Sequence, residues 1–185
     1  MATPTALPSS FTAGDVLTAA NMNLLRGAFR ILQVVSTTKD DTFSASLASG
    51  ASTAITGLSA TIAPTSTSSN ILVLCNISGT ANVDGAAIYM TLYRGVTAIG
   101  VGASPGSRQA VTSAIGSTLT GAATNAGTAI YLDSPATTSA TTYSVNISHS
   151  SGVTRTVYVN RSEVDTNNSS FTRSVSTITV LEVSA

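Results

Sequence analysis

Three residues of this chain occur in the order of a hydrolase triad. Gly102-Ala-Ser-Pro-Gly106 matches the Gly-x-Ser-x-Gly pattern of a serine nucleophile, and Asp133 and His149 follow in the order Ser, Asp, His. The residue after the nucleophile must donate its backbone N–H to the oxyanion, but Pro105 has none. The pattern also requires a helix after the serine, and residues 107–116 show no helical periodicity. The sequence therefore favours a Gly/Pro loop, and we expect no catalytic residue and no enzyme.

Candidate metal ligands are few and scattered. His149 is the single histidine, with no second His or Cys nearby to complete a zinc site. We expect it at a solvent-facing strand end beside the turn at 150–152. Four acidic residues could ligate calcium: Asp40, Asp41, Asp84 and Asp165. None of them lies in the spaced pattern of a calcium loop, and turn formation explains them better. The sequence predicts no metal site and no cofactor.

Cys75 is the single cysteine and lies in the apolar run Ile71–Cys75. An intrachain disulfide is therefore impossible, and a lone thiol in such a run is expected to be a small residue of the core.

Charged side chains are scarce in this sequence. They make up 9% of the residues, against roughly 25% in an average soluble protein, while Ser and Thr supply about a third. Eight basic and eight acidic residues cancel, and no Lys/Arg cluster forms the footprint of a nucleic-acid binder. No apolar run is long enough to span a bilayer, and the N-terminus lacks the features of a signal peptide. We expect no nucleic-acid partner, no membrane insertion and synthesis in the cytosol.

The same composition bears on assembly. With 43% hydrophobic residues and no net charge, identical copies repel each other little, and association would bury the small apolar groups. The sequence favours a homo-oligomer. A monomer solvated by its hydroxyl groups is the alternative.

From Ile31 onward the sequence reads as short β-strands separated by turns. The predicted strands are 31–35, 58–62, 71–77, 87–93 and 175–183. Two hairpins are predicted, one turning at Arg94-Gly95 and one at 150–152, which would pair 143–147 with 153–159. Residues 100–127 are expected to form long loops or short edge strands. We predict one all-β domain over 31–185, an antiparallel β-sandwich of jelly-roll type.

A short segment before this domain has a different pattern. In Phe11–Leu25, Thr18 is a suitable N-cap and Gly27 lies where a helix would end. A helix of about two turns is too short to be stable alone in water. We therefore expect residues 1–30 to form an extended arm and a short helical anchor, which rests on its own domain or on a partner.

Several segments resemble tailed-bacteriophage proteins. Phe11-Thr-Ala-Gly-Asp-Val-Leu-Thr-Ala-Ala-Asn-Met-Asn23 resembles a recurring segment near the start of phage fibre and tail-associated proteins. Four later segments are similar to phage-encoded jelly-roll knobs: Ile31–Val35, Gly57–Pro64, Leu132–Pro135 and Ser176–Val183.

The resemblance implies a non-enzymatic virion component, made in the cytoplasm of the host bacterium. Such proteins are usually homotrimers that dock on other virion proteins, of the capsid or the tail, through the N-terminal part. Six residues would then anchor the chain: Phe11, Asp15, Leu17, Met22, Leu24 and Leu25. The β-knob would face outward, with exposed loops that bind a host surface glycan through residues the sequence does not identify.

Two other functions stay open at this point. A capsid decoration protein would stabilise the shell and bind no host. A hydrolase acting on envelope polysaccharide would use the Gly-x-Ser-x-Gly segment. A tail fibre, a head fibre and a decoration protein all fit the resemblance.

Overall fold

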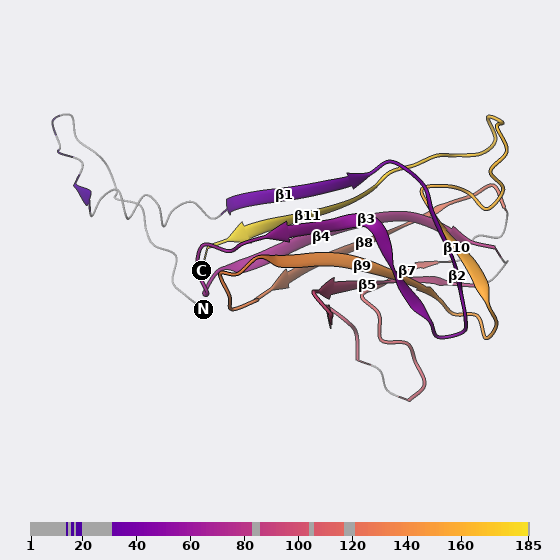
Figure 1. Cartoon of the computed structure of the whole chain (residues 1–185), viewed down its shortest axis with the longest axis horizontal. Helices are drawn as coiled ribbons and strands as arrows, with labels where there is room; N and C mark the ends of the chain where they lie inside the picture. The colour runs from indigo at the N-terminus through magenta and orange to yellow at the C-terminus, as the bar shows by residue number, and fades with distance from the viewer. Residues whose placement is uncertain are drawn as a thin grey trace.

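The computed structural model describes residues 31–82, 86–103, 106–116 and 121–184, together with Gly14, Val16, Thr18 and Ala19. In this part of the chain, eleven strands form two antiparallel sheets (Figure 1). The strands are β1 (Ile31–Lys39), β2 (Phe43–Leu47), β3 (Ser52–Ile62), β4 (Asn70–Ala81), β5 (Ile88–Arg94), β6 (Thr97–Ile99), β7 (Ser113–Gly116), β8 (Asn125–Asp133), β9 (Thr141–His149), β10 (Arg155–Val159) and β11 (Ser176–Val183). The predicted all-β architecture of two antiparallel sheets is confirmed.

The predicted helical anchor falls almost wholly outside the described residues. Of Phe11–Leu25, the structure describes Gly14, Val16, Thr18 and Ala19, and all four are exposed. The structure gives no support for a helix over this segment. All six predicted anchoring residues lie outside the described part of the chain.

The first sheet is built around β4. Residues Ile71–Gly79 pair with β8 on one side. On the other side, Asn70–Asn76 pair with β11 and Gly79–Ala81 pair with β10. Strand β1 pairs with β11, and β2 pairs with β10. Thus β1 and β2 occupy one interrupted strand position, and β10 and β11 occupy another.

The second sheet is built around β5 and β9. Strand β9 lies between β3 and β5. The free side of β5 pairs with β6 at Leu92–Arg94 and with β7 at Ile88–Met90. Strands β6 and β7 therefore also share one interrupted position, so that each sheet is four positions wide.

Strands near the start of the domain pair with strands near its end, and the pairing continues in order toward the middle of the chain. The first position (β1, β2) pairs with the last (β10, β11), β3 pairs with β9, β4 with β8, and β5 with β6 and β7. This is one long hairpin of four strand pairs rolled into two sheets, the order expected of the predicted jelly roll.

The core lies between the two sheets and follows the strand period of two residues. In β4, Ile71, Val73 and Cys75 are buried, and in β9 Tyr143, Val145 and Ile147 are buried. Cys75 is 2% exposed, and burial raises the pKa of its thiol to about 12. Its predicted place in the core is confirmed.

One predicted hairpin is correct and the other is wrong. Strands β5 and β6 form the hairpin predicted at Arg94-Gly95, with Gly95 at a φ of 56°. Strands β9 and β10 do not pair, because β9 belongs to the second sheet and β10 to the first. A strand shows the same alternation of buried and exposed residues whether it pairs with the next strand in sequence or with a distant one. The alternation at 143–159 therefore could not show whether β9 and β10 form a hairpin or belong to different sheets.

The region 100–127 contains both of the predicted kinds of structure. A loop follows β6, and β7 is a short strand at the edge of the second sheet. Strand β8 begins at Asn125 and pairs with the central strand β4, a role that was not predicted.

Candidate interaction surfaces

The charged residues within the strands all lie on core-facing positions. They are Lys39, Arg94, Asp133, Arg155 and Glu182. Each lies an even number of positions from the buried residues of its strand and so on the same side of the sheet, as Glu182 does with Ile178 and Val180. The outward-facing positions of the described strands therefore carry no charge. Sheets that face water normally show the opposite alternation.

Arg94, Asp133 and Tyr143 form one polar cluster at the end of the sandwich where β1 begins. The Arg94 guanidinium contacts both Asp133 carboxylate oxygens, at 2.9 and 3.0 Å. The buried Tyr143 hydroxyl donates to the same carboxylate at 2.7 Å. Burial and the hydrogen bond to Asp133 raise the pKa of Tyr143. Asp133 is thus held between two structural partners.

Glu182 forms a second cluster at the same end. Its carboxylate accepts hydrogen bonds from Gln33 Nε2 at 2.6 Å and from the Thr65 backbone N–H and hydroxyl, both at 2.7 Å. Burial raises the pKa of Glu182, but the hydrogen bonds from Thr65, Ser69 and Gln33 outweigh it and leave the pKa lowered. The cluster ties β1 and β11 to the connection between β3 and β4.

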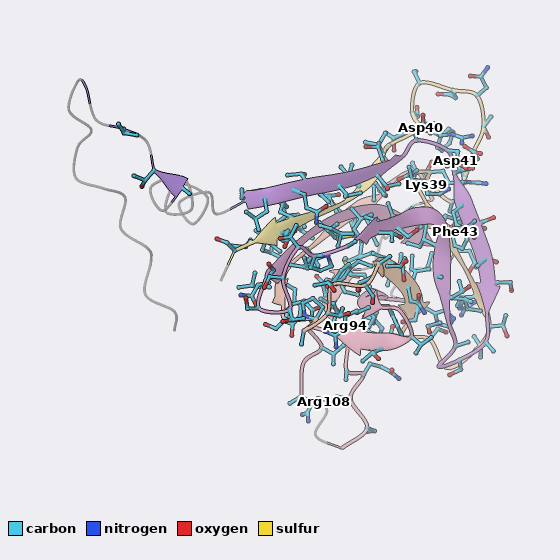
Figure 2. The ribbon with its side chains drawn as sticks, turned by 60° about the vertical axis from the view of Figure 1, so that its left-hand side comes forward. Lys39, Asp40, Asp41, Phe43, Arg94 and Arg108 are labelled. Atoms are coloured by element: carbon cyan, nitrogen blue, oxygen red, sulfur yellow. The ribbon has the colours of Figure 1, made fainter. Side chains whose placement is uncertain are left out.

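The opposite end of the sandwich holds Lys39 and the acidic turn that follows β1. Lys39 is buried and donates to the exposed Asp41 at 2.6 Å, and this hydrogen bond lowers the pKa of Asp41. Figure 2 shows Lys39, Asp40 and Asp41 together where β1 gives way to β2, with Arg108 on the protruding loop between β6 and β7.

The residues in hydrolase order do not form a triad with the geometry that catalysis needs. Asp133 contacts Tyr143 near the start of β9, whereas His149 ends that strand, six positions or about 20 Å further on. Ser104 and Pro105 lie outside the described residues. Asp133 and His149 are therefore too far apart to share a hydrogen bond.

The expected exposure of His149 is wrong. The side chain is 3% exposed; Nε2 lies 2.9 Å from the Leu47 carbonyl oxygen, and Nδ1 accepts a hydrogen bond from the Ser151 N–H. The imidazole closes the end of the core under the turn after β9. A ring with one donor and one acceptor can satisfy both backbone groups while buried.

The acidic residues also fail to gather into a metal site in the part of the chain that the structure describes. Asp41 pairs with Lys39, and Asp165 pairs with Arg161 and Arg173. Asp84 lies outside the described residues. Among the described ranges, no three His, Cys, Asp or Glu side chains come close enough to hold an ion together.

The outer side of the first sheet is an exposed surface that sequence reasoning did not identify. Its cross-strand rows change from apolar to polar along the strands. The row nearest the start of β1 is apolar, the next is mixed, and the third is polar. The three rows are Val34–Leu181–Leu72–Leu132, then Ser36–Thr179–Leu74–Ile130, then Thr38–Thr177–Asn76–Thr128.

We call the six apolar members of these rows the apolar face: Val34, Leu72, Leu74, Ile130, Leu132 and Leu181. Ile130 is 70% exposed, Val34 55% and Leu132 54%. An open depression of about 320 Å³ lies beside Leu74 and Ile130. Soluble monomers seldom expose a continuous patch of large apolar side chains, so this face is a candidate contact surface. The sequence did carry a signal, because an unbroken run such as Ile71–Cys75 places apolar residues on both sides of a strand.

The outer side of the second sheet is uncharged but differs in chemistry. Its central row combines Ser59, Ser144 and Tyr93, and Asn146 and Thr91 pair beside it. The two outer surfaces of the sandwich are therefore distinct, one largely apolar at one end and the other covered with hydroxyl groups.

Known proteins show little similarity to this chain. No protein-family model and no curated protein matches the chain. A solved structure, "Structure of infectious bursal disease virus Gx strain", is 16% identical, with a TM-score of 0.39 over 84% of this chain. The chain spans 38% of the length of that structure. This likeness is too low to carry an argument about fold or function. Within the described residues, no helix has the length and apolar character needed to cross a membrane.

Proposed function

We propose that this chain is a non-enzymatic structural protein of a bacteriophage virion, a homotrimeric jelly-roll knob on a short fibre. Residues 1–30 would attach it to the particle, and the β-domain would contact a host surface glycan. The observation that carries the proposal is the absence of charge from the outward-facing positions of the described strands, together with the apolar face.

A second copy of this chain is the partner that the apolar face suits best. Charged side chains on an outer surface oppose its burial against a second copy, because they would lose their hydration, and the outward-facing positions of the described strands carry no such side chains. Identical surfaces without charge do not repel each other when a symmetric oligomer forms. Burying Val34, Ile130 and Leu132 would remove the most exposed members of the patch from water.

The position of the apolar face fits attachment at one end. Its fully apolar row crosses β1, β11, β4 and β8 at the end where β1 begins and β11 ends (Figure 1). A trimer assembled there and mounted through residues 1–30 would leave the opposite end, with the loop between β10 and β11, directed outward.

The polar groups of the interior support a structural role. Asp133, Glu182 and His149 are each buried and each bound to partners that close an end of the sandwich. Groups committed in this way hold elements together rather than meet a substrate.

The mass of the purified chain in solution tests the interface. Sedimentation at micromolar concentration is expected to give three times the mass of one chain. Ile130→Lys places a charge on the apolar face at a position exposed to solvent, so it should yield a folded monomer. Ser59→Lys, on the outer side of the second sheet, is the matched control and should remain trimeric. A wild-type monomer, or equal behaviour of the two variants, would refute the interface.

A further inference from the structure

The loop between β10 and β11 is a candidate binding site that the proposed fold does not require. Residues 160–175 interrupt what is otherwise one strand position, at the end of the sandwich opposite the start of β1 (Figure 1). The loop closes on itself at its base, where Arg161 and Arg173 form an antiparallel bridge.

Side chains inside the loop fix its shape. Asp165 Oδ2 lies 2.7 Å from Arg173 Nη2 and 3.5 Å from Arg161 Nη1, so the carboxylate holds the two sides of the loop together. Asn168 caps the tip, because its side-chain oxygen accepts from the Ser170 N–H and its carbonyl oxygen accepts from the Phe171 N–H. A loop with these internal bonds presents a preformed surface to a ligand.

An open cavity of about 280 Å³ lies within this loop. The lining that bears on recognition is Asp165, Asn167, Asn168, Phe171, Thr172 and Arg173. This volume is at the lower limit of small-molecule sites, which suits a ligand the size of one sugar ring.

Several polar groups of the cavity are free to bind. Within the described chain, the Asn167 amide and the Thr172 hydroxyl make no hydrogen bond, and Asp165 is held through Oδ2, so that Oδ1 can still accept. Amide and guanidinium N–H groups supply donors, and the carboxylate and amide oxygens supply acceptors. Phe171 adds a half-buried aromatic ring beside them.

The charges of the loop determine which ligands fit. Arg161 and Arg173 cancel Glu163 and Asp165 within residues 160–175. A cavity with both donors and acceptors, one aromatic face and no net charge is matched by a neutral polyhydroxylated ring. Nucleic acids and phosphate groups require an excess of positive charge instead.

We propose that this cavity binds an uncharged monosaccharide unit at the end of a host surface glycan. The inference rests on the proposed function, for which it supplies the contact site. Hydroxyl groups of the sugar would exchange hydrogen bonds with Asp165 and Asn167, and its apolar face would lie on Phe171. Affinity at one site is expected to be weak, and three sites on one trimer raise the overall avidity.

The test measures binding of methyl glycosides of the common hexoses, 6-deoxyhexoses and N-acetylhexosamines to the full chain by saturation-transfer NMR. At least one glycoside is expected to bind. Asn167→Ala should weaken that binding about tenfold through the lost hydrogen bonds. Asn146→Ala removes an amide that also lacks a side-chain hydrogen bond in the described chain, but it lies on the outer side of the second sheet. This control should bind within about twofold of the wild type.

Absence of binding to every glycoside, or equal loss in the two variants, would overturn the proposal. Sedimentation of the same samples distinguishes failure of the sugar site from failure of the proposed trimer. A trimer that binds no glycoside refutes the sugar site alone, whereas a monomer refutes the assembly on which the proposed function rests.

Discussion

Glu182 shows how a single side chain combines burial and charge in this fold. It is fully buried in β11, yet it stays ionised because Gln33 and Thr65 donate three hydrogen bonds to it. A carboxylate stabilised in this way in the folded state, but not in the unfolded chain, couples stability to pH.

Glu182→Gln is expected to destabilise the protein by about 1–3 kcal/mol at neutral pH, since an amide nitrogen would face the Thr65 donors. The pKa of Glu182 is lowered on folding from 4.5. The unfolded chain therefore binds the proton more tightly, and the stabilisation is present above the unfolded pKa and lost as the pH falls through the folded pKa. Denaturant unfolding between about pH 6 and pH 3 should show the difference between wild type and variant shrink.

Glu163→Gln is the control for that measurement, because the Glu163 side chain accepts no hydrogen bond in the described chain. This variant should follow the wild type at each pH. A Glu182→Gln difference that stays constant with pH would contradict the assigned role of the carboxylate.

At the level of single residues, sequence patterns located the core better than the polar interior. Cys75 was placed correctly, because an apolar run indicates burial without knowledge of the partner strand. His149 was not, because its burial depends on the Leu47 carbonyl group, 102 positions away in sequence. The buried structural roles of Glu182 and Asp133 had no signal in the sequence for the same reason.

At the scale of the elements, one side chain connects the strands at the two breaks of the first sheet. Asn160 makes these contacts at the end of the sandwich opposite the start of β1. Its amide nitrogen donates to the Lys39 and Asp41 carbonyl oxygens at 2.8 and 2.9 Å, and its side-chain oxygen accepts from the Ser176 hydroxyl at 2.6 Å. Asn160 thus joins the break between β1 and β2 to that between β10 and β11. It also has a φ of 61°, which few residues other than Asn and Gly adopt.

Asn160→Gly keeps this backbone conformation accessible but removes the three hydrogen bonds, so it should cost about 2–4 kcal/mol. Asn160→Ala should cost about 1 kcal/mol more, because alanine is strained at positive φ. Thermal unfolding measures the two losses. Hydrogen exchange should accelerate within residues 161–175 before it does in β4. Equal exchange in both segments would show that Asn160 does not hold the loop.

Most strand positions were predictable from the sequence, although β2 and β8 were not predicted, whereas strand partners were predictable only at the hairpin of β5 and β6. The strand patterns located most of β1, β4, β5 and β11 but only the second half of β3, and the turn residues located the hairpin at Gly95. The error at 150–152 arose because period-two patterns identify a buried face but contain no information on which strand lies beside it. The sequence did not show that β1 and β2, or β10 and β11, lie in line in the same sheet on the two sides of the breaks at 40–42 and 160–175. This arrangement depends on the partner strands, which the pattern of each segment does not identify.

The two ends of the whole molecule differ in their surfaces. Its apolar row lies at the end where β1 begins, and its loop cavity lies at the other. The proposed attachment function would require this separation, because assembly at one end would have to leave the loop cavity at the other end accessible.

Deletion of residues 1–30 should leave the β-domain folded and trimeric but prevent its incorporation into particles. The contacts that close the described sandwich begin at Ile31, where β1 pairs with Val183. Circular dichroism and sedimentation check the fold and the mass, and immunogold microscopy of particles checks incorporation. Incorporation of the shortened chain would refute attachment through residues 1–30. Label on the shell or on the tail would distinguish a head fibre or decoration protein from a tail fibre.

The pairing of β1 with β11 also constrains synthesis. Gln33 and Glu182 meet across 149 positions of sequence, so β1 lacks its neighbour until nearly all of the described chain has left the ribosome. Contacts this distant slow folding, and unpaired apolar strands invite the wrong neighbour in the interval. When many copies are made close together, an unpaired β1 can also pair with β11 of a second copy, so the local concentration of nascent chains affects how much correctly folded protein is made.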